Sequence, residues 1–223
     1  MMHPKDFAVG YSEKTFHAMF SQTASAVVVD GIFHIKSLLT PEFIAEVNEW
    51  FARSNSQRAN INGRKDNAAE TGSDRISVYD EVSSQLLFTN LANLICEEYK
   101  GNSDRALGKE WEMCGVNPLW RGIRYNPGDA LVAHYDDSFI KNDTERSLMS
   151  VVMYFTEGET HFMTDPRHDH GYSDFVEWNG IIDHRFVCKP GDVLVFDHRL
   201  FHSGPRVDRE KRIIRTDLMY HLK

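Results

Sequence analysis

Residues 124–138 read RYNPGDALVAHYDDS, a short apolar segment that follows a Pro-Gly-Asp break and ends in polar residues. This pattern is typical of a strand entered through a turn. Because strand side chains alternate, His134 and Asp136 project from one face and Tyr135 from the other. Such a pair can offer two ligands to a metal ion without distorting the backbone.

The pair alone is weak evidence for a metal site. With 11 histidines and 33 acidic residues in 223 positions, about one or two triplets of a histidine, any residue and an acidic residue are expected by chance. A third ligand must come from another strand. Residues 189–204, KPGDVLVFDHRLFHSG, place His202 after a glycine turn and an apolar run, with His198 as its rival four residues earlier. Two histidines and one carboxylate form the facial triad of non-haem Fe(II) oxygenases, which leaves positions open for co-substrate and oxygen.

The composition is that of an ordinary globular chain, with 41% hydrophobic and 26% charged residues. Its net charge of -8 and pI near 5.7 argue against a nucleic-acid-binding surface. No apolar run of about 20 residues is present, and the start lacks a secretory pattern, so we expect no membrane association and a cytoplasmic location. The cysteines Cys96, Cys114 and Cys188 are widely spaced and predict free thiols.

The N-terminal half predicts a strand pair and two helices. Residues 26–39, AVVVDGIFHIKSLL, read as two strands around Asp30-Gly31. Thr40-Pro41 offers an N-cap and a first helical residue for a helix that extends to about Phe51. The polar residues 55–75 are predicted to form a loop.

A second helix is predicted over residues 80–99, with Gly101 as its stop signal. Its apolar stripe is expected to pack in the core. The stripe consists of Val82, Leu86, Leu87, Leu91, Leu94 and Ile95.

From about Trp120 the chain consists of short strands broken by Gly, Pro and Asp, typical of an antiparallel sandwich or barrel. The apolar run over residues 148–155 suits a strand covered on both faces. We therefore expect one domain over residues 1–223. Residues 1–115 would supply N-terminal strands and supporting helices, and residues 116–223 a jelly-roll core, giving a mainly β, α+β fold.

Four segments in this order resemble the core motifs of Fe(II)/2-oxoglutarate-dependent dioxygenases of the prolyl 4-hydroxylase-like group. They are RYNPGDALVAHYDDS, MYFTEGETHF, KPGDVLVFDHRLFHSG and KRIIRTDLMYH. The resemblance covers about residues 120–223 and extends weakly to the segment DGIFHIKSLLTPEF. It implies a double-stranded β-helix, and Fe(II) bound by His134, Asp136 and His202. The His-Ser-Gly sequence at His202 fits the family better than the surroundings of His198.

The resemblance also implies a basic residue beyond the distal histidine that pairs with the far carboxylate of 2-oxoglutarate. Lys211, Arg212 and Arg215 are the candidates. Lys211 and Arg215 share a strand face, whereas Arg212 faces the other way. Arg215 is favoured because a guanidinium grips a carboxylate with two hydrogen bonds, with Lys211 next. Tyr125 corresponds to a tyrosine that often donates its hydroxyl to the co-substrate.

The implied activity is hydroxylation of an unactivated C–H bond, with Fe(II), 2-oxoglutarate and O2 as cofactors, ascorbate as a candidate accessory reductant, and succinate and CO2 as products. Related halogenases carry a small residue where this chain has Asp136. A small molecule or a single protein side chain is the expected substrate. The alternative is a cupin-type metal-binding protein or metalloenzyme that does not use 2-oxoglutarate.

Residues 165–184 are rich in histidine and aspartate, which by composition resemble metal ligands. No fixed geometry follows from their spacing. We expect a solvated loop near the mouth of the site, with a structural metal or a substrate lid as the alternatives.

Overall fold

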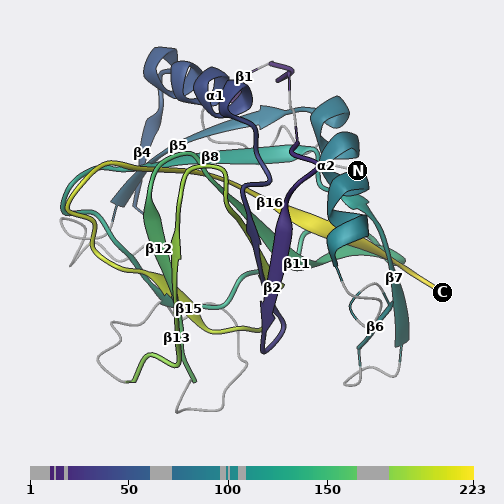
Figure 1. The fold of residues 1–223 in the computed structure, drawn as a ribbon. Helices are drawn as coiled ribbons and strands as arrows, with labels where there is room; N and C mark the ends of the chain where they lie inside the picture. Colours follow the sequence, from purple (N-terminus) through teal and green to yellow (C-terminus); the bar gives the residue numbers. More distant parts are fainter. Residues whose placement is uncertain are drawn as a thin grey trace.

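The fold consists of two facing β-sheets with two helices on the outside of the larger one (Figure 1). The structure is a computed structural model. The structure describes residues 11–12, 14–17, 20–60, 72–95, 99, 101–104, 109–164 and 181–223.

The larger sheet has the strand order β1-β5-β8-β16-β11-β14-β3-β2. These strands are β1 (Tyr11–Ser12), β5 (Gly72–Tyr79), β8 (Leu119–Tyr125), β16 (Lys211–Leu222), β11 (Glu145–Tyr154), β14 (Val193–Asp197), β3 (Ile32–Lys36) and β2 (Ser25–Val29). Flanking strands join it at the sides: β4 (Gln57–Asn60), β6 (Gly101–Asp104), β7 (Lys109–Val116) and β10 (Ile140–Asn142).

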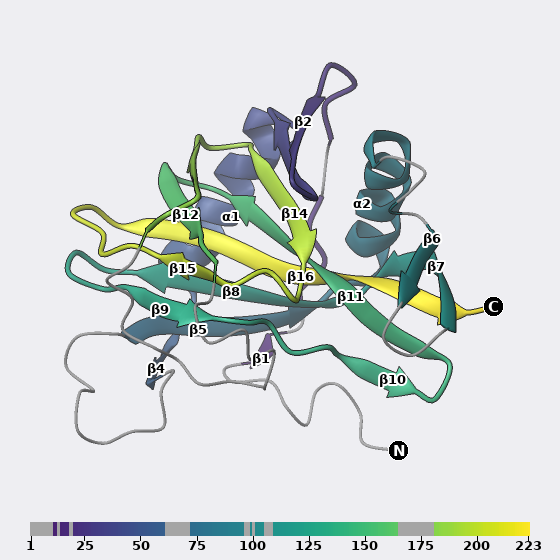
Figure 2. The ribbon, with the colours of Figure 1, turned by 90° about the horizontal axis from the view of Figure 1, so that it is seen from below.

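The smaller sheet has the order β13-β12-β15-β9. Its strands are β13 (His184–Cys188), β12 (Gly158–Phe162), β15 (His202–Gly204) and β9 (Leu131–His134). Along the chain, β8, β11, β14 and β16 of the larger sheet alternate with strands of the smaller sheet, as Figure 2 shows from below. This winding is the double-stranded β-helix, so the predicted jelly-roll, mainly β fold is confirmed.

The N-terminal predictions are also confirmed. Strands β2 and β3 pair around Asp30 and Gly31, whose φ angles of 49° and 78° are those of a tight hairpin turn. Helix α1 (Pro41–Arg53) begins after Thr40, whose hydroxyl accepts a hydrogen bond from the Phe43 amide.

Helix α2 (Glu81–Leu94) differs from its prediction. Asp80 caps its start, but the helix ends at Leu94, and Gly101 begins β6 instead of stopping a helix. Val82 and Leu86 are 60% and 44% exposed, so the predicted stripe is only partly buried.

The buried face of α2 combines Leu87 and Leu91 with Ser83 and Ser84. The Ser84 hydroxyl accepts a hydrogen bond from the Trp120 indole at 2.7 Å. Since hydrogen-bonded hydroxyl groups can be buried, apolar periodicity alone misplaced this face.

The predicted loop over residues 55–75 is also wrong at its ends. Residues 57–60 form β4 and residues 72–75 begin β5, and the two strands pair. Residues 61–71 lie outside the described residues.

Alternating side chains of the larger sheet fill two separate cores. On β11, Val151 and Met153 pack with the helices, whereas Val152 and Tyr154 face the smaller sheet. The predicted two-sided burial of this strand is therefore confirmed. Among the described residues, no helix is long and apolar enough to cross a membrane.

Candidate active site

Three side chains at the ends of β9 and β15 converge between the sheets. His134 and His202 lie opposite each other in the β9–β15 pair, and their ring centroids are 4.3 Å apart. Asp136, two residues beyond His134, places its carboxylate oxygens 3.5 Å from His134 Nε2 and 3.6 Å from His202 Nε2. Their potential ligand atoms all lie within 4.8 Å of one another.

Both histidines present the same nitrogen to the cluster. His134 Nδ1 lies 2.9 Å from the Val132 carbonyl, and His202 Nδ1 lies 2.9 Å from the Leu200 carbonyl. Because a carbonyl oxygen can only accept, each Nδ1 carries a proton, and in the neutral form of either ring Nε2 keeps the lone pair. Burial, with His134 alongside, lowers the pKa of His202 to about 3, so this imidazole is neutral. The donor set therefore fits a divalent transition metal.

Asp136 is tied into an ion-pair network at one end of the cluster. Arg215 lies 3.1 Å from Asp136 and 3.2 Å from Asp217, and Arg121 lies 2.8 Å from Asp217. Ser150 donates a hydrogen bond to Asp136. Burial by itself raises the pKa of Asp136, but Arg215 and the two histidines hold it well below its ordinary value. The carboxylate is thus ionised and fixed in place.

Lys211 lies on the same face of β16 as Arg215 but has different surroundings. Its amine donates to the Glu159 carbonyl at 3.1 Å and lies 4.8 Å from the centre of the Tyr125 ring. A Cβ at Gly158 would lie 2.4 Å from Lys211 Cδ, so only glycine leaves room for this side chain. Burial lowers the pKa of Lys211 to about 8. No carboxylate among the described residues forms an ion pair with Lys211.

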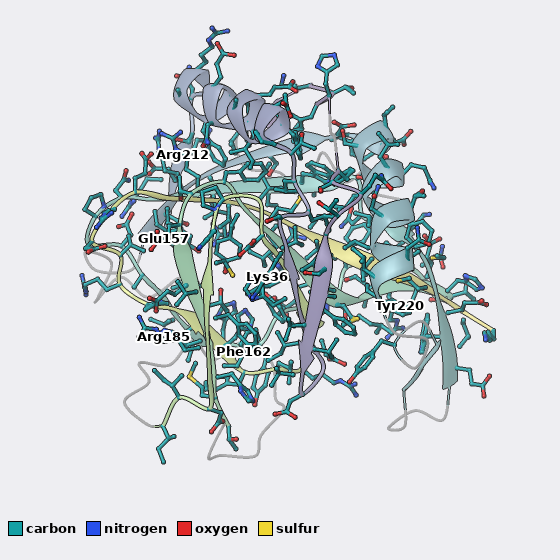
Figure 3. All side chains as sticks on the ribbon, viewed as in Figure 1. Lys36, Glu157, Phe162, Arg185, Arg212 and Tyr220 are labelled. Atoms are coloured by element: carbon teal, nitrogen blue, oxygen red, sulfur yellow. The ribbon has the colours of Figure 1, made fainter. Side chains whose placement is uncertain are left out.

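The other sequence candidates lie elsewhere. Arg212 points from the opposite face of β16 toward Asn48 of α1, where Figure 3 labels it. His198 Nε2 lies 3.6 Å from Asp217 and outside the cluster. In the histidine-rich segment, residues 165–180 lie outside the described residues, and His184 bonds Asp30 at 2.8 Å.

A second group of potential ligands consists of His34, Cys188 and Asp192, between β3 and the β13–β14 turn. The Asp192 carboxylate is already bonded to His34 and to the amide of Ser37. Burial raises the pKa of the Cys188 thiol to about 12. A protonated thiol and a saturated carboxylate do not favour a metal ion, so this group is structural.

The cluster opens into a cavity of about 280 Å³ between the two sheets. Lys211 and Tyr125 line it, as do Arg121 and Arg215, all four from the paired strands β8 and β16. Arg75 of β5 also lines it. In the sequence, the segment around Arg75 resembles a family segment in which an arginine or asparagine can approach substrate, but this weak resemblance assigns Arg75 no catalytic role. The sequence assigned no role at all to Arg121. The pairing of β5, β8 and β16 brings both residues to this wall.

No family model matches the chain, and no curated protein is similar to it in sequence. Solved structures are similar in fold. A prolyl-4-hydroxylase from Pseudomonas putida has 17% sequence identity, covers 84% of this chain and 91% of its own, and gives a TM-score of 0.50. A viral collagen prolyl hydroxylase from Paramecium Bursaria Chlorella virus-1, in its 2OG complex, has 14% sequence identity. It covers 86% of this chain and 97% of its own, and gives a TM-score of 0.49. The first likeness supports the same fold.

Proposed function

We propose that this protein is an Fe(II)- and 2-oxoglutarate-dependent oxygenase that hydroxylates an unactivated C–H bond of a small molecule or a protein side chain. The observation that carries the proposal is the convergence of His134 Nε2, His202 Nε2 and the Asp136 carboxylate on one cavity. That cavity also holds the buried Lys211 amine, which forms no ion pair with the described residues. The fold shared with the Pseudomonas putida prolyl-4-hydroxylase supports it as an analogy of architecture.

The three ligands would bind Fe(II) on one side and leave the cavity side open. When bound, iron, 2-oxoglutarate and O2 supply the oxidising chemistry and yield succinate and CO2. The role of the chain is to hold these groups. The Val132 and Leu200 carbonyls fix the two imidazoles, and Arg215 fixes the carboxylate.

For the far carboxylate of 2-oxoglutarate, the surroundings favour Lys211 over Arg215. The Arg215 guanidinium already pairs with Asp136 and Asp217. Lys211 is buried and no described carboxylate pairs with it, so a carboxylate of the ligand would compensate its charge. Tyr125, whose ring lies under the amine, would donate its hydroxyl to the same carboxylate. Lys211 would therefore be the anchor, with Tyr125 beside it.

The test is anaerobic spectroscopy of the protein with Fe(II) and 2-oxoglutarate. The wild type should develop the weak visible charge-transfer band of the chelated complex, and His134→Ala should lose it. His198→Gln removes a nearby imidazole that is not in the cluster and should keep the band. A wild-type protein that binds iron and gives no band would remove the 2-oxoglutarate assignment.

A further inference from the structure

Arg75 is a cation of the cavity that the proposed cofactors leave without a partner. It lies on β5 opposite Ile123 of β8, and paired residues of adjacent strands point to the same side of a sheet. Ile123 lies opposite Ile213 of β16. All three residues line the cavity, so the guanidinium is held on the same wall as the Lys211 and Arg215 side chains.

Among the described residues, no carboxylate lies at ion-pairing distance from the Arg75 guanidinium. Within the described part of the chain, the Arg75 Nε donates a hydrogen bond to the Ser73 hydroxyl at 3.3 Å. Its side chain is half-buried. Burial lowers its pKa and Arg215 adds to this, whereas Tyr125 and the Asp136 carboxylate raise it. By contrast, Arg58 of the neighbouring strand β4 pairs with both Asp129 and Asp74.

The cations that line the cavity differ in their partners among the described residues. Arg121 and Arg215 share the carboxylates of Asp217 and Asp136. Lys211 would pair with the far carboxylate of 2-oxoglutarate. Asp137 also lines the cavity, but it is exposed and forms no ion pair with Arg75. Within the described part of the chain, the Arg75 guanidinium therefore has no ion-pair partner.

We propose that Arg75 binds a carboxylate of the substrate, so that the substrate is a small organic acid and not a neutral molecule. This inference rests on the proposed function, because it names the substrate class of that site. A guanidinium binds a carboxylate through two parallel hydrogen bonds, and the half-buried position strengthens them. The cavity of about 280 Å³ suits a small molecule.

The experiment is calorimetric titration of the full chain, loaded anaerobically with Fe(II) and saturated with 2-oxoglutarate. The probes are four acids, each paired with its carboxamide: acetate, butanoate, benzoate and 3-phenylpropanoate. At least one acid should bind the wild type at least tenfold more tightly than its amide. Arg75→Gln should reduce this ratio to about one, and Arg75→Lys should retain part of it.

One control variant and one control measurement keep the result specific. Arg53→Gln removes an equal charge from the exposed face of α1 and should leave the ratio unchanged. Affinity for 2-oxoglutarate should stay the same in Arg75→Gln, which separates a substrate contact from co-substrate binding.

The assignment is overturned if every acid binds the wild type no better than its amide, or if the preference survives in Arg75→Gln. A failure of the proposed function has a different signature. In that case 2-oxoglutarate itself does not bind. The same acid and amide titrations are then made in Lys211→Met, where Lys211 cannot bind the acids, so any preference for an acid reports on Arg75.

Discussion

Lys211 and Arg215 lie four residues apart on the same face of one strand, yet their charges are balanced in different ways. Arg215 lies between the carboxylates of Asp136 and Asp217. Lys211 has a carbonyl oxygen and an aromatic face as neighbours. We infer that Arg215, whose charge is already balanced, maintains the site, whereas Lys211 can receive an anionic ligand. Sequence spacing treats the two alike.

The largest expected effect is on stability. Arg215→Met leaves two buried carboxylates short of a partner and should lower the free energy of unfolding by about 3 kcal/mol. Lys211→Met breaks no ion pair and should change it by less than about 1 kcal/mol. Urea unfolding of the metal-free proteins measures both values. Equal losses in the two variants would refute the contrast.

Affinity for 2-oxoglutarate should show the opposite contrast. Lys211→Met should weaken binding about 50-fold, as expected for the loss of a buried charged hydrogen bond of about 2.3 kcal/mol. Calorimetry with Fe(II) under nitrogen provides the measurement. The matched control is Lys141→Met, which removes an exposed lysine paired with Glu145 and should bind normally. Unchanged affinity in Lys211→Met would point to another anchor.

The pH dependence follows from the depressed pKa of Lys211, about 8 against an ordinary 10.5. Only the protonated amine pairs with a carboxylate, so affinity for 2-oxoglutarate should fall about tenfold per pH unit well above pH 8. Lys211→Arg should bind with little change over this range. Affinity of the wild type that is constant to pH 10 would contradict the role of Lys211.

Stability of the ligand-free protein should respond to pH in the opposite sense. Between pH 8 and 10.5 the unfolded chain holds the Lys211 proton and the folded chain does not. The free energy of unfolding therefore gains a contribution that rises with pH across this window. Comparison of wild type with Lys211→Met in urea isolates it, and identical pH profiles would argue against a buried, titrating amine.

The smallest effect concerns Tyr125. Burial raises the pKa of its phenol to about 12, so it is a neutral donor at physiological pH. Tyr125→Phe should weaken 2-oxoglutarate binding about fivefold, the value of one neutral hydrogen bond of about 1 kcal/mol. The change in affinity, measured by the same calorimetry, should be far below that of Lys211→Met. A loss as large as that of Lys211→Met would make the tyrosine the principal anchor.

Local patterns predicted much of this architecture. The hairpin at Asp30 and the capped helix after Thr40 depend on residues adjacent in sequence. Alternation on β16 correctly separated Arg212 from Lys211 and Arg215. Strand patterning also predicted the jelly roll, because apolar strands broken by turns have few other ways to bury both faces.

Features that depend on distant pairing could not be predicted in this way. The Asp217 partner of Arg215 and Arg121 is indistinguishable from a surface carboxylate in the sequence. Arg75 reaches the cavity only because β5 extends the larger sheet beside β8. The ranking of Arg215 above Lys211 used guanidinium chemistry and the form of the motif RIIRTDLMY, without knowledge of the ion pairs that now favour Lys211.

The most direct test of this account is a crystal structure of the protein grown anaerobically with Fe(II) and 2-oxoglutarate. The account predicts the metal on His134, Asp136 and His202, and the far carboxylate of 2-oxoglutarate on Lys211 with Arg215 still paired to Asp136. A far carboxylate bound by Arg215, or a metal outside the three ligands, would contradict it.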